Sequence, residues 1–170
     1  MPVVTTTTTR TTSMAVHTIS FRGLAGGIFI TLALACVLYV IGFSTTAWSI
    51  TGHSYRGLWL SCSCYSQNRV EDWFRAVQAM ITIGLIGLLL GMILVCVYMC
   101  VHTISKNTTI IALVVICFLS AIFMLIGFVI YGTKADDLSW SFIVTVIASI
   151  LCLLAGILSI LQMRSSGVRM

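Results

Sequence analysis

Four long runs of apolar residues constrain this chain more than any other feature, because none of them contains Asp, Glu, Lys, Arg or His. Each is at least about as long as the roughly 20 residues that a helix needs to cross the hydrocarbon core of a bilayer. Strands of a membrane barrel would be about 10 residues long and would alternate in polarity, so continuous runs favour helices. The runs cover about residues 23–43, 76–101, 109–131 and 138–161. The sequence therefore predicts four membrane-spanning helices.

Composition indicates the same class of protein. Of 170 residues, 59% are hydrophobic and 8% are charged, and the mean hydropathy is +1.13. A soluble domain carries roughly 25% charged residues, so this chain has too few polar groups to cover a surface exposed to water. Short connections join the four runs, which is typical of a single bundle. We expect an all-α membrane protein whose one domain is a four-transmembrane-helix bundle.

Polar segments flank the predicted bundle. Residues 1–21 are rich in threonine and contain little that could be buried, which predicts a disordered cytoplasmic tail. Residues 22–164 form the predicted four-span domain, and residues 165–170 form a second, short cytoplasmic tail. The first apolar run is too long for a typical signal-peptide core, so we expect it to remain as a membrane anchor.

The loop between the first two runs holds nearly all of the exposed surface that could be structured. It contains Trp48, then Gly57-Leu58-Trp59, then Cys62 and Cys64. Tryptophan prefers the boundary between membrane and water, and paired cysteines are typical of compartments outside the cytosol. Aromatic and hydroxyl residues interrupted by glycines favour two or three short strands. The loop therefore predicts a small extracellular β-cap.

Four spans place both termini on one side of the membrane, and we predict that this side is the cytoplasm of a plasma-membrane protein. Five basic residues then lie inside against four outside, and all four acidic residues lie outside. That is weak support from the positive-inside rule. The glycosylation sequon Asn107-Thr108-Thr109 favours the opposite orientation, because it falls in a loop predicted to be cytoplasmic. A glycan on Asn107 would overturn the predicted orientation.

The first-loop residues resemble a known superfamily. Trp48 followed by Gly57-Leu58-Trp59-x-x-Cys62 and a second cysteine is similar to the signature shared by claudins, peripheral myelin protein, epithelial membrane proteins and the lens fibre intrinsic membrane protein. Val77-Gln78-Ala79 resembles the peripheral myelin and epithelial branch, whereas claudins tend to have an arginine where Gln78 stands. Ser139-Trp140-Ser141-Phe142 resembles the lens protein. The resemblance covers about residues 22–164 and implies a claudin-like four-helix bundle.

The resemblance also implies roles for the signature residues. Trp48, Gly57, Leu58 and Trp59 would hold the cap on the outer ends of the helices, and Cys62 and Cys64 would form a disulfide. The family's cysteines are usually further apart, whereas here only Ser63 separates them. A disulfide needs α-carbons about 4.4–6.8 Å apart, so this ring would be strained. Free thiols and a bond between protomers remain alternatives.

Two further departures bear on function. Both outer loops are short beside those of claudins, so we do not expect a paracellular pore. The final Val168-Arg169-Met170 lacks the Tyr-Val ending typical of claudins, and we do not expect a PDZ partner.

Cys96 and Cys100 lie at the cytoplasmic end of the second run, where cysteines are candidates for S-palmitoylation. Their alternative role is that of small residues in a helix.

Small residues also repeat at helical spacing within the runs. Such residues let helices approach closely in lipid, so we expect them to pack within the bundle, with contacts between protomers as the alternative. The repeats are Gly23 with Gly27, Gly87 with Gly91, and Ala148 with Cys152 and Gly156.

The sequence favours a non-enzymatic protein without a cofactor. Catalysis inside a membrane needs ionisable side chains that face the bundle interior, and the histidines are scattered without metal-ligand spacing. A net charge of +5 suits a lipid bilayer and gives no support for binding nucleic acid. The favoured hypothesis is a structural or adhesive tetraspan protein of cell junctions or compact membranes that forms homo-oligomers. The alternative is an auxiliary subunit that regulates the gating or trafficking of a channel or receptor.

Overall fold

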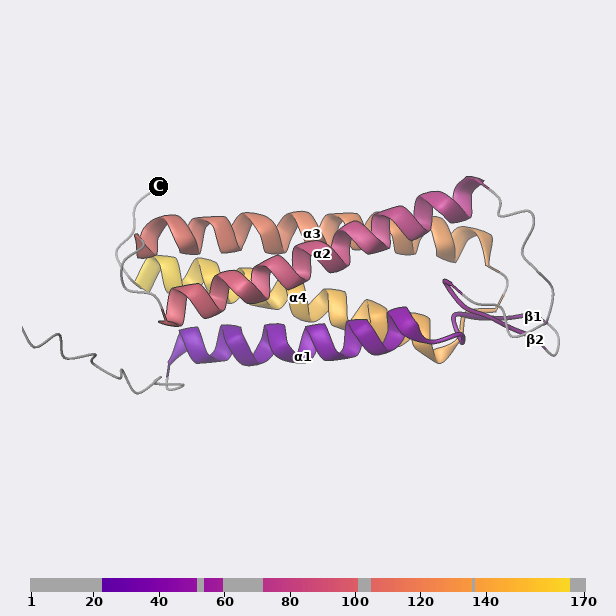
Figure 1. Cartoon of the computed structure of the whole chain (residues 1–170), viewed down its shortest axis with the longest axis horizontal. Helices are drawn as coiled ribbons and strands as arrows, with labels where there is room; N and C mark the ends of the chain where they lie inside the picture. Colours follow the sequence, from indigo (N-terminus) through magenta and orange to yellow (C-terminus); the bar gives the residue numbers. More distant parts are fainter. Residues whose placement is uncertain (1–22, 52–53, 60–71, 101–104, 136, 166–170) are drawn as a thin grey trace, which may run out of the picture.

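The computed structural model describes residues 23–51, 54–59, 72–100, 105–135 and 137–165. They form helix α1 (Leu24–Ser44), strands β1 (Ser49–Thr51) and β2 (Ser54–Arg56), and helices α2 (Asp72–Cys100), α3 (Lys106–Lys134) and α4 (Trp140–Ser165) (Figure 1). All four helices are long and apolar enough to cross a membrane. The prediction of four such helices is confirmed.

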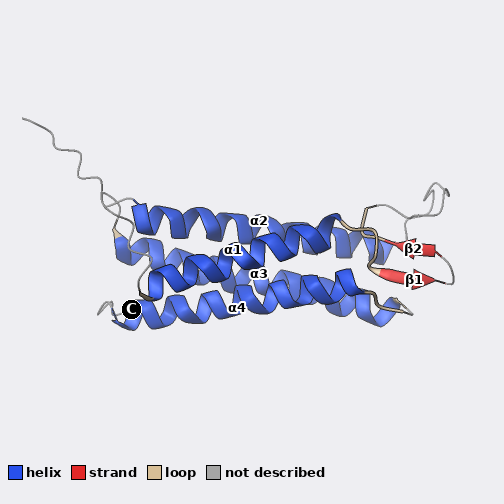
Figure 2. Ribbon diagram, turned by 90° about the horizontal axis from the view of Figure 1, so that it is seen from below, coloured by secondary structure: helices blue, strands red, loops and turns tan. Residues whose placement is uncertain are grey.

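The helices lie side by side and alternate in direction (Figures 1 and 2). Helix α1 packs against α2 and α4, and helix α3 also packs against α2 and α4, so the four helices close into a ring. The β1–β2 hairpin lies at one end of the bundle, which we call the hairpin end. Helix α1 begins and α4 ends at the opposite end, which we call the terminal end.

The helices extend beyond the apolar runs that predicted them. Helix α2 begins at Asp72, about one turn before its run, and α3 continues from Lys106 to Lys134, almost a turn beyond its run at both ends. Hydrogen bonding of the backbone remains favourable in the headgroup region, where charged side chains reach water. The apolar run therefore marks the hydrocarbon-spanning part of each helix and underestimates its full length.

Glycines from both helices bring α2 and α3 together. A methyl group added at Gly87 would lie 2.9 Å from Ser120 Cβ, and one added at Gly127 would lie 2.8 Å from Ile81 Cγ1. The Ser120 hydroxyl donates a hydrogen bond of 2.6 Å to the Gly84 carbonyl oxygen. Lipid tails are as apolar as leucine, so close packing and hydrogen bonds of this kind hold membrane helices together.

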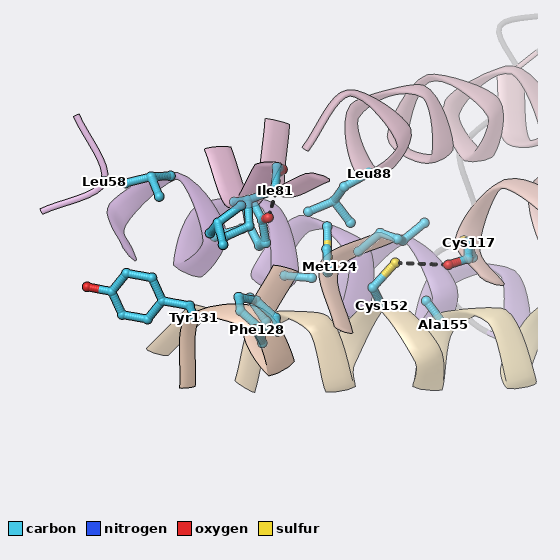
Figure 3. Packing of buried hydrophobic residues seen from close by; sticks show 14 of the residues in the cluster. Leu58, Ile81, Leu88, Cys117, Met124, Phe128, Tyr131, Cys152 and Ala155 are labelled. Carbon is cyan, nitrogen blue, oxygen red and sulfur yellow. Dashed lines mark hydrogen bonds between the residues drawn. The ribbon is translucent and has the colours of Figure 1, made fainter. Parts of the chain in front are cut away.

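Two more hydrogen bonds join neighbouring helices in the buried interior. The Tyr39 hydroxyl of α1 donates to the Ile81 carbonyl oxygen of α2 at 2.9 Å. The Cys152 thiol of α4 donates to the Cys117 carbonyl oxygen of α3 at 3.6 Å (Figure 3). A buried donor without a partner would be costly in an apolar medium, so each of these bonds helps to set how its helices face one another.

One of the small-residue repeats makes no close contact with a neighbouring helix, and the other two pack within the bundle. A methyl group at Gly23 or Gly27 would meet no atom within 4 Å, so this pair makes no close contact with the described part of the bundle. The other repeats pack within the bundle, in agreement with the expectation. The packed members are Gly87 and Gly91 against α3, Gly156 against α3, and the buried Ala148 and Cys152.

We predict that Gly87→Leu destabilises the bundle by about 1–3 kcal/mol, because the new side chain must displace Ser120 and part α2 from α3. Gly27→Leu is the matched control, since it makes the same chemical change in a helix at a position with open space. Unfolding by sodium dodecyl sulfate in mixed micelles, followed by circular dichroism, measures both. Equal unfolding midpoints for the two variants would contradict the packing described.

Candidate functional site

The described residues of the first loop, 45–51 and 54–59, form a unit that we call the cap. Strand β1 pairs antiparallel with β2, with Ile50 opposite Tyr55. On its other side β1 bonds to the connection between α3 and α4. The Ile50 amide donates to the Asp137 carbonyl oxygen at 3.0 Å, and the Ser139 amide donates to the Trp48 carbonyl oxygen at 2.9 Å. Two loops that are distant in sequence are therefore fixed to each other by backbone hydrogen bonds.

Trp48 lies at the centre of this junction and is fully buried. Its indole Nε1–H donates a 2.6 Å hydrogen bond to the carbonyl oxygen of Gly42, close to the end of α1. The last carbonyl groups of a helix have no partner within the helix. The Thr45 hydroxyl donates to the same oxygen at 3.0 Å. Trp48 and Thr45 therefore close the end of α1 at the point where the chain turns into the cap.

The Trp48 ring also packs into an aromatic cluster contributed by two other helices. Its centroid lies 5.3 Å from that of Tyr131 and 5.8 Å from that of Phe142, both in edge-on geometry, and 6.5 Å from that of Phe128. Aromatic pairs of this kind contribute about 0.5–1.5 kcal/mol beyond their buried area. The Tyr131 hydroxyl donates to Ser49 Oγ at 3.1 Å. The Trp48 side chain thus contacts α1, α3 and α4.

The remaining helix holds the cap through Gln78 of α2. Its Nε2–H group donates a 2.7 Å hydrogen bond to the carbonyl oxygen of Leu58, whose side chain is fully buried beside the buried Gly57. In the sequence, Gln78 stood out only through its likeness to one branch of the superfamily, and its bond to Leu58 was not predicted. A usable signal was present, because an amide within an apolar run needs a hydrogen-bond partner.

Trp59 differs from the other signature residues. It is 48% exposed, and its ring centroid lies 5.3 Å from that of Phe43 near the end of α1. The structure therefore brings Trp48, Gly57 and Leu58 against the bundle and leaves Trp59 at the rim. Trp73 and Trp140 lie in the first turns of α2 and α4, and Trp140 is 51% exposed.

Several predicted sites lie outside the described residues, namely Cys62 and Cys64, the tail 1–21 and the final Val168-Arg169-Met170. Cys96 and Cys100 are described and lie in the last turns of α2 at the terminal end, where Cys96 is half-buried and Cys100 is exposed. Both are free thiols. Their acylation stays a prediction, and it is sterically open at Cys100.

The junction is built for holding a loop in place. The indole of Trp48, the phenol of Tyr131, the carboxamide of Gln78 and the Thr45 hydroxyl donate to backbone or hydroxyl oxygens. The Ser49 hydroxyl accepts from Tyr131, and the buried Ser141 hydroxyl has no partner among the described residues. Within the part of the chain that the structure describes, no three His, Cys, Asp or Glu residues lie close enough to bind a metal ion.

Neither the protein-family models nor the curated proteins with which the sequence was compared give a match. The likeness to the claudin superfamily therefore rests on the residues quoted above.

We predict that Trp48→Phe lowers the free energy of unfolding by about 2 kcal/mol, because it removes the bond to Gly42 and leaves a void among the aromatic rings. Trp140→Phe is the matched control, because Trp140 is half exposed and its replacement changes stability by less than about 0.5 kcal/mol. Thermal unfolding in detergent compares the two. A similar loss for both would show that Trp48 has no special role in the junction.

We predict that Gln78→Met loosens the cap without unfolding the helices. The change keeps the length of the side chain but leaves the Leu58 carbonyl oxygen without its donor, at a cost of about 1 kcal/mol. Hydrogen exchange by mass spectrometry should detect faster exchange in peptides that cover residues 54–59. Gln162→Met, which removes a contact to Tyr98 at the terminal end, should leave that exchange unchanged. Unchanged exchange in Gln78→Met would refute the proposed tether.

Proposed function

We propose that this protein is a non-enzymatic, structural tetraspan protein of the plasma membrane, related to the peripheral myelin, epithelial and lens branch of the claudin superfamily. In this proposal it organises cell junctions or compact membranes by lateral association of its helices and by presenting a small extracellular cap. The observation that carries the proposal is the junction around Trp48. Residues of the superfamily signature, Trp48 and Leu58, are the ones that meet the four helices there.

The position of the cap favours this role over a pore between cells. Strand β1 is bonded on both edges, to β2 and to residues 137–139, so this part of the loop is fixed to the end of the bundle. A paracellular pore requires loops that project far enough to meet those of a neighbouring cell. A short cap held in this way suits contacts made close to the membrane surface.

The proposed orientation places both termini in the cytoplasm. The sequon Asn107-Thr108-Thr109 favoured the opposite orientation, but its position in the structure weakens that objection. Asn107 lies in the first turn of α3, and Thr109 is buried, with its hydroxyl donating to the Ser105 carbonyl oxygen at 3.2 Å. Asn107 lies just before the third apolar run, where a transferase working at the membrane surface would reach it poorly.

The absence of enzymatic activity is also part of the proposal. In the described spans, the buried hydroxyl and thiol groups of Tyr39, Ser120, Thr145 and Cys152 donate to backbone carbonyl oxygens. Hydrogen bonds of this kind serve helix packing and leave these groups engaged in structure.

One observation favours the alternative role of an auxiliary subunit. The half-exposed Trp59 and the neighbouring Phe43 form an aromatic surface at the rim of the bundle, beside the exposed Val40 and Ile41 of α1. Tryptophan is enriched among the residues that dominate protein interfaces. A larger membrane protein could cover this surface in a stable complex.

Crosslinking in native membranes followed by affinity purification distinguishes the two roles. We expect homotypic crosslinks and enrichment at cell borders. If the auxiliary role holds instead, Trp59→Ala should reduce recovery of the partner severalfold, whereas Trp140→Ala, which removes an equally exposed tryptophan from α4, should not. Stoichiometric recovery of one larger membrane protein would establish the auxiliary role instead. A monomer spread evenly over the membrane would contradict both.

A further inference from the structure

The two ends of the bundle differ in charge. Three of the four acidic residues of the sequence fall in the two connections that join helices at the hairpin end, and the fourth, Asp72, is the first residue of α2. Asp72 and Asp137 are the described members. The charged residues that the structure describes at the terminal end are Lys106 and Arg164, and both are exposed. The sequence beyond the helices at this end adds further arginines and no acidic residue. The terminal end therefore has a net positive charge.

The two basic residues lie on neighbouring helices at the same depth. Lys106 is the first residue of α3, Arg164 is in the last turn of α4, and α3 packs against α4. Buried residues begin within one turn of each, at Thr109 and Met163. A helix rises about 1.5 Å per residue, so both charges lie within about one turn of the apolar span, at the level of lipid headgroups.

The stability of α3 does not explain the position of Lys106. The amino-terminal end of a helix carries a partial positive charge, so a lysine at the first position is electrostatically unfavourable there. In the described part of the terminal end no carboxylate is present to offset it. A negative charge outside the chain would provide the compensation.

We propose that Lys106 and Arg164 form a basic rim that binds the headgroups of anionic phospholipids in the adjacent leaflet. Both side chains have long apolar stems that follow the helix surface and charged ends that reach the headgroups. Each basic residue near an anionic membrane surface contributes about 1 kcal/mol, which is about a fivefold preference. The rim therefore selects phosphatidylserine over phosphatidylcholine at the terminal end. This inference does not depend on the adhesive or auxiliary role proposed above.

The test uses the full-length protein reconstituted in phosphatidylcholine vesicles that contain a trace of spin-labelled phosphatidylserine or spin-labelled phosphatidylcholine. Electron paramagnetic resonance measures the fraction of each label that is immobilised at the protein surface. We expect the wild type to prefer phosphatidylserine severalfold in 20 mM salt and to lose most of that preference in 1 M salt, where the Debye length is about 3 Å.

The decisive comparison removes charge from opposite ends of the bundle. We expect Lys106→Gln with Arg164→Gln to abolish the preference, whereas Lys134→Gln, at the last residue of α3, should retain it. The exchange variant Lys106→Arg with Arg164→Lys keeps both charges and should also retain it. The proposal is overturned if the wild type shows no preference, if the double glutamine variant keeps it, or if Lys134→Gln or the exchange variant loses it.

Discussion

The lack of hydrogen-bonding partners in hydrocarbon governs this structure. Inside the bundle a buried hydroxyl or thiol without a partner is costly, and the side chains of Tyr39, Ser120, Thr145 and Cys152 donate to backbone carbonyl oxygens. Ser120 reaches the Gly84 carbonyl because glycines allow α2 and α3 to approach, and Tyr39 reaches α2 from α1. These bonds set the rotation of each helix about its axis. That rotation in turn decides which side chains face inward at the hairpin end, where Tyr131 and Phe142 meet Trp48.

The cap depends on all four helices for its position. Trp48 connects it to the end of α1 and to aromatic rings of α3 and α4, and Gln78 connects Leu58 to α2. The connection between α3 and α4 completes the arrangement by bonding along one edge of β1. A short hairpin is marginally stable alone in water, so its order here comes from the bundle beneath it. The loop and the helices are best regarded as one cooperative unit.

The sequence predicted the features that depend on a short stretch of chain. It did not predict the features that depend on contacts between distant segments. Runs without charge predict spans because the thickness of the bilayer sets a simple length requirement. The pairing of β1 with residues 137–139 was not predictable, because that connection has no alternating pattern and its partner lies far away in the chain. Residues of the same type also differ in how deeply they are buried. Gly87 packs against Ser120 while Gly27 faces open space, and Trp48 is buried while Trp59 is half exposed, because burial depends on the opposing element.

The long separation between the two halves of the junction has a consequence for biosynthesis. Tyr131 and Ser49, which bond in the finished protein, are 82 residues apart. At a synthesis rate of roughly 5–20 residues per second, roughly 4–16 seconds pass between the synthesis of Ser49 and that of Tyr131 on α3, and the α4 partner Phe142 follows later. During that interval the indole of Trp48 and the edge of β1 lack their final contacts. The cap therefore reaches its final contacts only after α3 and the first turn of α4 have been made.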